Sequence, residues 1–139
     1  MDQSTIFGPL FAMFLLTFVV WSYMFFTRIR HIVSNEVDPG DPAFEAQLEL
    51  PRLKNPTDNF KNLFEIPVLF YAISLYLFVT GQVDAFYLTA AWAFVGLRVV
   101  HSAIHCTVNA VTPRFMVYMV STGALWVIAG RALARTLGA

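Results

Sequence analysis

The feature that most constrains this chain is its first apolar stretch, residues 3 to 27, which contains no charged side chain. About 20 apolar residues are enough for a helix to cross the hydrocarbon core of a bilayer. Three further stretches of the same character follow. Charged residues make up 13% of the chain, whereas a soluble domain carries about 25%. We therefore expect an integral membrane protein.

The four apolar stretches are predicted to be helices, because lipid offers the backbone no hydrogen-bond partners and no alternating barrel pattern is present. We expect these helices at about residues 6–27, 59–80, 85–109 and 114–134, with a polar connector at residues 28–57. A short interfacial helix is expected in the connector at residues 43–50. The whole chain, residues 1–139, is then a single all-α domain, an integral membrane four-helix bundle.

Basic residues predict the orientation of the bundle. Four spans put both termini on one side of the membrane. Six basic residues flank the connector and the last turn, and only two lie at the opposite end: Arg28, Arg30, Arg52, Lys54, Lys61 and Arg114 against Arg131 and Arg135. Because cytoplasmic segments are enriched in positive charge, we expect the connector in the cytoplasm and the termini outside.

Two simpler observations exclude other classes of protein. The formal net charge is zero, so nothing indicates electrostatic binding of nucleic acid. Cys106 is the only cysteine, which rules out a disulfide within the chain.

Polar residues within the apolar stretches are concentrated in one layer of the predicted bundle. A charge inside the bilayer costs at least ~2.5 to 3.5 kcal/mol on insertion scales, so each one calls for a reason. The layer lies in the half of the bundle near the connector and is shared by three helices: Asn62, Glu65, Arg98, His101, His105, Asn109, Arg114 and Tyr118. This shared layer is the candidate site.

Arg98 is the deepest member of the layer, ~15 Å from the end of its helix at 1.5 Å per residue. Glu65 is the only acid within a predicted span. We therefore expect a direct contact between Arg98 and Glu65.

Plainer interpretations of these residues stay open at this stage. Arg98 and Glu65 could form a structural pair that fixes the order of the helices. His101 and His105 supply at most half of a metal site, and no third ligand is well placed, so no metal is predicted. The arginines at helix ends could anchor lipid headgroups, and Tyr118 could belong to an interfacial aromatic belt.

At these same residues the sequence resembles the MAPEG superfamily, the membrane-associated proteins in eicosanoid and glutathione metabolism. The third-helix motif resembles the Arg-x-x-His-x-x-x-Tyr run of the prostaglandin E synthase branch, with a histidine in the last position. The resemblance covers four spans in the same order with a long first loop, nearly the whole chain. Its motifs are Arg28-Ile-Arg30, Asn62-Leu-Phe-Glu65-Ile-Pro67, Arg98-Val-Val-His101-Ser-Ala-Ile-His105, and Pro113-Arg114 followed by Tyr118.

The resemblance implies a homotrimer that holds glutathione as co-substrate between protomers on the cytoplasmic side. It implies a glutathione-dependent transferase or peroxidase of lipophilic small molecules, and likeness to the bacterial members implies the bacterial inner membrane. The implied catalytic residues are Arg114, which stabilises the thiolate, and Tyr118. The implied glutathione-binding residues are Asn62 and Glu65 at the γ-glutamyl end, Arg28 and Arg98 at carboxylates, and His101 and His105 beside them.

The chain departs from the family pattern at three positions. Asp58 stands where an arginine is expected, His105 replaces the tyrosine, and Phe115 replaces a polar residue after Arg114. Each change removes a hydrogen-bond donor near the peptide or its sulfur. Two alternatives from other classes therefore accompany the enzyme hypothesis: a non-catalytic subunit or assembly partner of a larger membrane complex, and a lipid or quinone binder.

Overall fold

A computed structural model describes residues 2–138 of the protein, and within them it contains helices and no strands. The all-α class predicted from the sequence is therefore confirmed. The elements in chain order are η1 (Gln3–Ile6), a short 3-10 helix, and α1 (Phe7–Asn35), α2 (Pro42–Gln47), α3 (Pro51–Asn62), α4 (Ile66–Val79), α5 (Ala85–Cys106) and α6 (Val111–Thr136).

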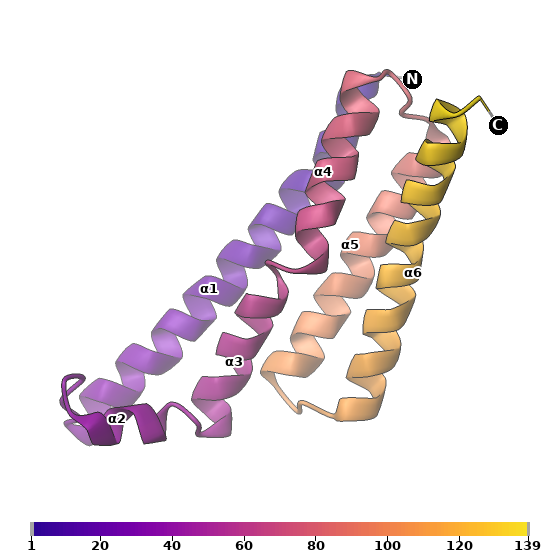
Figure 1. Ribbon diagram of the computed structural model, residues 1–139. Helices are drawn as coiled ribbons and strands as arrows, with labels where there is room; N and C mark the ends of the chain where they lie inside the picture. The colour runs from indigo at the N-terminus through magenta and orange to yellow at the C-terminus, as the bar shows by residue number, and fades with distance from the viewer. Residues whose placement is uncertain (1, 139) are drawn as a thin grey trace.

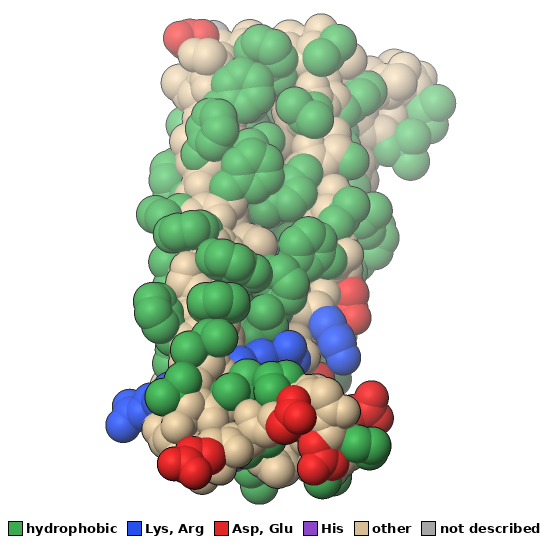
Figure 2. Space-filling view, turned by 90° about the vertical axis from the view of Figure 1, so that its left-hand side faces the viewer, with side chains coloured by type: hydrophobic (Ala, Val, Ile, Leu, Met, Phe, Trp, Pro, Cys, Tyr) green, Lys and Arg blue, Asp and Glu red, His purple; other side chains and the backbone are tan. Residues whose placement is uncertain are grey.

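Four helical stretches are long and apolar enough to cross a membrane, which supports the predicted multi-pass membrane protein. They are Gln3–Asn35, Pro51–Val79, Ala85–Cys106 and Val111–Thr136. On the side formed by α1, apolar side chains cover most of the height of the molecule, and most charged side chains gather near its lower end (Figure 2).

The helices run alternately up and down, so that the molecule has two distinct ends (Figure 1). Both termini and the α4–α5 turn lie at one end, which we call the terminal end. The short helix α2 and the α5–α6 turn lie at the other, which we call the connector end. Helices α5 and α6 lie side by side, whereas α1 slants away from them toward the connector end.

The connector differs from the sequence expectation, because much of residues 28–57 is helical. Helix α1 continues to Asn35 and ends where Glu36 adopts a left-handed conformation, with φ 50°. Once a helix is nucleated, each further residue adds a hydrogen bond at little cost, so α1 continues beyond its apolar stretch. The expected interfacial helix is present as α2, where Asp41 caps the first turn by accepting the Ala43 N–H at 2.8 Å.

The second span also differs, because the helix expected at residues 59–80 starts earlier, at Pro51, and is broken after Asn62. Helix α3 ends at Asn62 and α4 begins at Ile66. Pro67 has no N–H to continue the hydrogen-bond ladder, and proline disfavours helical geometry in the residue before it. Glu65 accordingly lies outside the helical region, with φ −99° and ψ −103°. The break separates Asn62 and Glu65, which an unbroken helix would place on one face.

The last two helices agree with the prediction to within about three residues at each end. The turn between them contains Asn109 in a left-handed conformation, with φ 47°. Asparagine adopts this conformation more readily than most residues, so it ends α5 without a glycine. The apolar core lies among α1, α4, α5 and α6, and Phe70 and Phe94 stack at its centre with ring centroids 4.6 Å apart.

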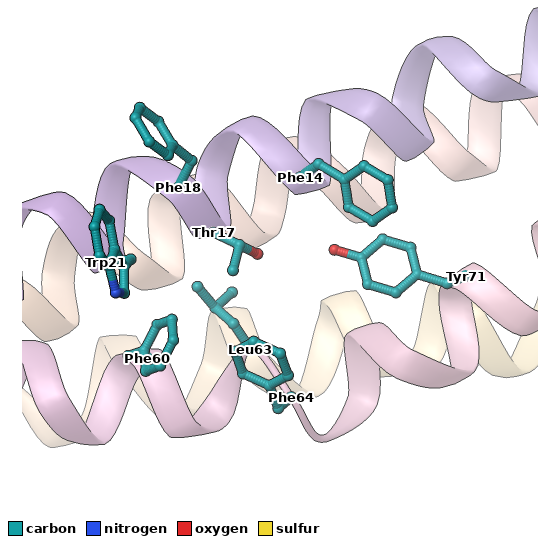
Figure 3. A pocket seen from close by; sticks show the side chains of 8 residues that line it. All are labelled: Phe14, Thr17, Phe18, Trp21, Phe60, Leu63, Phe64 and Tyr71. Atoms are coloured by element: carbon teal, nitrogen blue, oxygen red, sulfur yellow. The ribbon is translucent and has the colours of Figure 1, made fainter.

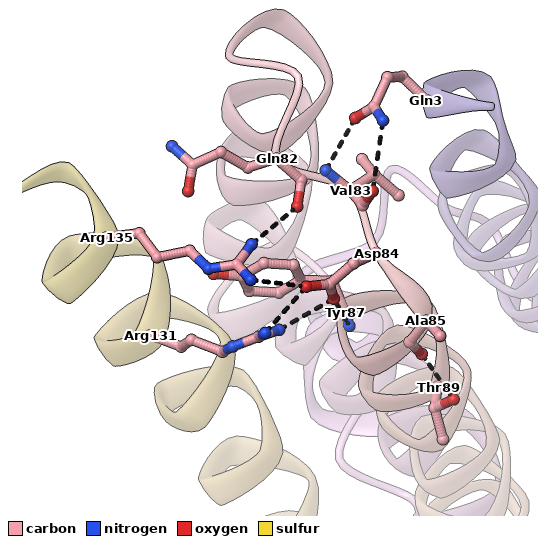
Figure 4. Close-up of polar contacts among 9 residues, drawn as sticks. All are labelled: Gln3, Gln82, Val83, Asp84, Ala85, Tyr87, Thr89, Arg131 and Arg135. Carbon is pink, nitrogen blue, oxygen red and sulfur yellow. Dashed lines mark hydrogen bonds and ion pairs between the residues drawn. The ribbon is translucent and has the colours of Figure 1, made fainter. Parts of the chain in front are cut away.

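The terminal end is held together by a group of polar contacts around Asp84 (Figure 4). Asp84 forms ion pairs with Arg131 at 2.8 Å and Arg135 at 2.9 Å. The side chain of Gln3 accepts the N–H of Val83 at 2.8 Å and donates to its carbonyl at 3.3 Å. These contacts fix η1 and the end of α6 to the α4–α5 turn.

Replacing Asp84 by asparagine should weaken the fold and change its response to acid. The hydrogen bond from Arg131 lowers the pKa of Asp84 to about 2. A lowered pKa means that the ionised carboxylate adds stability above about pH 4, and that this stability is lost as the pH falls toward 2. Because the Asp84 side chain is one-third exposed, we expect Asp84→Asn to cost only about 1 kcal/mol at pH 7.

Thermal unfolding in detergent at pH 7, 4 and 2 measures this effect. The melting temperature of Asp84→Asn should fall less between pH 4 and pH 2 than that of the wild type. Glu36→Gln is the control, because it removes an exposed acid at the other end of the molecule. Identical acid profiles for the wild type and Asp84→Asn would contradict a contribution from these ion pairs.

Candidate functional site

A polar cavity of about 180 Å³ lies at the connector end between α3, α5 and α6. His101 and His105 lie one turn apart on α5, and Arg114 and Tyr118 lie one turn apart on α6. Five of the eight site residues expected from the sequence line the cavity. The complete lining is Asn62, His101, His105, Val111, Arg114, Phe115 and Tyr118.

Arg98 lies behind this cavity and is completely buried. Its Nη1 donates a hydrogen bond to the Asn62 Oδ1 at 3.1 Å. Its guanidinium carbon lies 4.8 Å from the ring centroid of Tyr118 and 5.4 Å from that of Phe94. The aromatic faces and the amide oxygen partly compensate the loss of water around the cation.

The expected direct contact between Arg98 and Glu65 is wrong, because Asn62 stands between them. The Nδ2 of Asn62 donates to the Glu65 Oε2 at 3.3 Å, and no ion pair joins the two charged residues within residues 2–138. The break after α3 is the physical reason. It directs Glu65 outward, where the side chain is exposed, while Asn62 faces the cavity.

Four buried nitrogen atoms around the site have no hydrogen-bond partner in the described part of the chain. They are Nε and Nη2 of Arg98, Nδ1 of His101 and Nδ1 of His105. Buried polar atoms in native proteins are almost always paired with protein or water. A guanidinium can only donate, so the two Arg98 atoms call for an acceptor such as a carboxylate.

Arg114 is held in place by a short chain of side-chain hydrogen bonds. It donates to the Oδ1 of Asn109, and the Nδ2 of Asn109 donates to the Oδ1 of Asn55 at 2.9 Å. These contacts connect the start of α6 to α3 across the α5–α6 turn. The sequence indicated Asn109 only as a member of the polar layer, without a role, and its left-handed conformation explains why it can turn toward Arg114.

Sequence reasoning missed a second buried group beside the cavity. Asn59 is completely buried, donates to the Sγ of Cys106 at 3.3 Å and accepts from the Oγ of Ser102 at 3.3 Å. Asn59 lies three residues before Asn62, on the same side of α3. That spacing is the signal that could have identified it. These contacts fix α3 against α5 and so position Asn62.

Arg28, another expected site residue, does not line the polar cavity. Its Nη2 donates to the Oγ1 of Thr57 at 3.0 Å, and its buried Nε has no partner among residues 2–138. Arg28 and the outward-facing Glu65 therefore both lie outside the cavity.

A separate groove of about 390 Å³ lies between α1 and the break in the second span (Figure 3). The only polar side-chain groups in its lining are two hydroxyls and one indole N–H, and Figure 3 shows the hydroxyls of Thr17 and Tyr71 directed toward each other. It shares no lining residue with the polar cavity. The lining is Phe14, Thr17, Phe18, Trp21, Phe60, Leu63, Phe64 and Tyr71. The polar cavity, which alone of the two carries cations and imidazoles, is therefore the candidate site.

Comparison with known protein families matches residues 6–134 to the MAPEG family. The matched region includes all four candidate spans except a few terminal residues, and every residue that lines the polar cavity. Searches of curated proteins and of solved structures found no match.

Proposed function

The chain belongs to the MAPEG family, and on that premise we propose that it is a glutathione-dependent transferase or peroxidase acting on lipophilic electrophiles. Members of this family generally use glutathione. The observation that carries the proposal is the set of four unpartnered nitrogens on His101 and His105, which line the polar cavity, and on Arg98, which lies behind it.

Glutathione offers the groups that these nitrogens lack. It carries two carboxylates, two peptide carbonyls, an ammonium and a thiol. The free Nε and Nη2 of Arg98 lie on one edge of its guanidinium, and this pair of donors suits a carboxylate bidentately. The ammonium suits the Glu65 carboxylate and the Asn62 amide oxygen.

The opposite side of the cavity suits the sulfur. A thiol reacts as its thiolate, which a nearby cation stabilises. Arg114 is the cation that lines the cavity, and it lies in the first turn of α6, where the helix dipole adds positive potential. In the proposed reaction Arg114 stabilises the thiolate, and Tyr118 and His105 donate hydrogen bonds to the sulfur or to the electrophile.

Binding of glutathione to the purified protein in detergent is the test of this proposal. Titration calorimetry should detect binding of glutathione and also of an analogue that has a methyl group in place of the thiol. Losing a charge-assisted hydrogen bond costs about 1.5 to 3 kcal/mol. The Arg98→Met variant should therefore bind both ligands with an affinity at least about tenfold lower. Lys54→Gln is the control, because Lys54 is exposed and lines neither cavity.

Failure of the wild type to bind glutathione at millimolar concentration would overturn the enzyme proposal. The interpretation as a packing subunit of a larger membrane complex, or as a lipid or quinone binder, would then replace it. Co-purification with a defined complex would favour the first of these, and retention of a quinone through purification would favour the second.

We also propose that the protein is a homotrimer whose protomers share each site. The cavity of about 180 Å³ within one protomer is smaller than the ~300 to 1,000 Å³ typical of ligand sites. A neighbour would enlarge it and bring its own Arg28. The outward-facing Glu65 also favours assembly, since a carboxylate exposed to lipid is costly.

The expected assembly is three copies, with the second span (α3 and α4) lining the central interface. Light scattering of the detergent-solubilised particle, corrected for bound detergent, measures the protein mass. A monomeric mass would contradict both the trimer and the shared site.

We further propose that the protein lies in a bacterial inner membrane with its connector end in the cytoplasm. A cysteine introduced at Asp41, in a background where Cys106 is replaced by alanine, should resist an impermeant thiol reagent added to intact cells and react after lysis. Labelling of intact cells would show the reverse orientation.

A further inference from the structure

A second polar cavity, of about 380 Å³, lies at the connector end on a different part of the molecule. Its walls are the last turns of α1, from Tyr23 to Asn35, and Arg52 of α3. None of its lining residues lines the proposed glutathione cavity. What occupies it is therefore a question separate from the proposed enzyme activity.

The two arginines in this cavity have no negative partner within residues 2–138. Neither Arg30 nor Arg52 forms an ion pair there. Among the described residues, the side chain of Arg30 is also without a hydrogen bond, and Arg52 bonds only to His31, through Nη2 to Nδ1 at 2.7 Å. The cavity thus presents two positive charges with most of their donors free.

His31 fixes Arg52 without neutralising it. The ring is buried, and its Nε2 lies 2.7 Å from the Oε1 of Gln47. Because a guanidinium can only donate, Nδ1 must accept from Arg52 and the ring proton must lie on Nε2. The Nδ2 of Asn35 lies 3.1 Å from the same Nδ1 and donates to the His31 carbonyl at 2.7 Å. Arg52 is therefore held in position by a neutral ring.

The length of the first apolar stretch leads us to expect the cavity at the level of the lipid phosphates. The apolar part of the first span, residues 6–27, is about 33 Å long at 1.5 Å per residue, close to the ~30 Å of the hydrocarbon core. Thr27 is thus near the edge of the hydrocarbon, and Arg30 is about 4.5 Å beyond it. Tyr23 extends the cavity to the apolar side, in the position where tyrosines favour the interface.

We propose that this cavity binds a phosphate ester at the membrane surface. Arg30 and Arg52 contact the phosphate oxygens, Ser34 and Asn35 contact the polar part of the ester, and Tyr23 and Thr27 lie against its apolar part. Guanidinium groups bind phosphate bidentately, and basic pockets beside membrane helices suit anionic headgroups. The source of the phosphate is either a lipid headgroup or a soluble ester, and the experiment separates the two.

The experiment is native mass spectrometry of the full-length protein in detergent, titrated with defined lipids. Phosphatidylglycerol is the anionic probe, and phosphatidylcholine, whose headgroup carries no net charge, is the reference. A surface arginine contributes about 1 kcal/mol to anionic binding, or roughly fivefold in affinity. We expect Arg30→Gln to weaken phosphatidylglycerol binding about fivefold, and Arg30→Gln with Arg52→Gln to weaken it roughly thirtyfold.

Arg30→Gln is the decisive variant, because Arg30 has no protein partner among the described residues and its loss should leave the fold intact. The helical circular dichroism and melting temperature of each variant verify this. Lys54→Gln is the control, because it removes the same charge two residues from Arg52 without touching the cavity. Its lipid binding should equal that of the wild type.

A competition step identifies the source of the phosphate. Glycerol phosphate that displaces the anionic lipid would assign the site to a soluble ester, and lipid that resists displacement would assign it to a headgroup. Equal binding of phosphatidylglycerol by the wild type and Arg30→Gln, with no binding of glycerol phosphate, would overturn the proposal. An equal loss of binding in Lys54→Gln would also overturn it, because the effect would then be general surface charge.

Discussion

Replacing Arg114 by alanine is expected to reduce glutathione turnover by about 10²- to 10³-fold, the loss typical of removing one preorganised charge-stabilising group. A free thiol has a pKa of about 8.5, so only a few per cent is thiolate at neutral pH. Arg114 lines the cavity, and Asn109 orients its guanidinium. Tyr118→Phe removes one neutral hydrogen bond and should reduce turnover by roughly fivefold.

The ultraviolet absorbance of bound thiolate, followed across pH, measures the effect directly. In Arg114→Ala, the pKa of the bound thiol should rise toward that of free glutathione. Arg114→Lys keeps the positive charge, so it should retain part of the lowering of this pKa that the wild type shows. Lys54→Gln is the control and should titrate as the wild type does. A wild-type titration curve in Arg114→Ala would assign the thiolate to another cation, either Arg98 or Arg28 of a neighbouring protomer.

Replacing Asn62 by leucine is expected to destabilise the protein by about 3 kcal/mol, because it leaves the buried Arg98 without its hydrogen bond to protein. Leucine branches at Cγ as asparagine does and is somewhat larger, so the substitution leaves no cavity. Adding Arg98→Met removes the stranded charge. The double variant should therefore lose clearly less unfolding free energy than the two single variants lose in sum, as is typical of coupled sites.

Unfolding in mixed micelles without glutathione measures these free energies. Glu65→Gln keeps the shape of the side chain at an exposed position and should cost less than about 1 kcal/mol. Strict additivity of Asn62→Leu and Arg98→Met would show that the two side chains do not support each other. The unfolding free energies could also show a large coupling between Glu65 and Arg98 that persists in the Asn62→Leu background. Such a coupling would indicate that Glu65 and Arg98 contact each other directly after all.

The sequence was sufficient to predict the class and much of the lining of the candidate cavity, because both depend on helical spacing. Uncharged runs about 20 residues long mark the spans in any membrane protein. Arg98, His101 and His105 are three and four residues apart, a spacing that places them on one face of any regular helix. All three are buried on α5, and Arg98 and His101 lie beside Tyr118 of α6.

Predictions failed where the helix is not regular. The contact between Arg98 and Glu65 assumed an unbroken second helix, and the break before Pro67 turns Glu65 away. Pro67 itself was the signal, because a proline interrupts the hydrogen bonds of a regular helix.

The contacts at the terminal end were missed for a different reason. Arg131 and Arg135 were counted only as charges on one side of the membrane, whereas both pair with Asp84, 47 or more residues away. Spacing along a helix shows which residues share a face, but not which loop that face meets. The same limit applies to Arg52, whose partner His31 lies 21 residues earlier.

The break in the second span also has a consequence for how far water is expected to enter the membrane. Because Pro67 has no N–H, the carbonyl of Leu63 loses its helical donor, and an unpaired carbonyl in hydrocarbon costs several kcal/mol. Leu63 lies about 18 Å along the span from Pro51. We therefore expect water to reach the break along the Asn62 side of α3, and the amide hydrogens around the break to exchange faster with deuterium than those of α5 at the same depth. If glutathione binds in the polar cavity as proposed, such water would give a proton released from its thiol a path to bulk solvent.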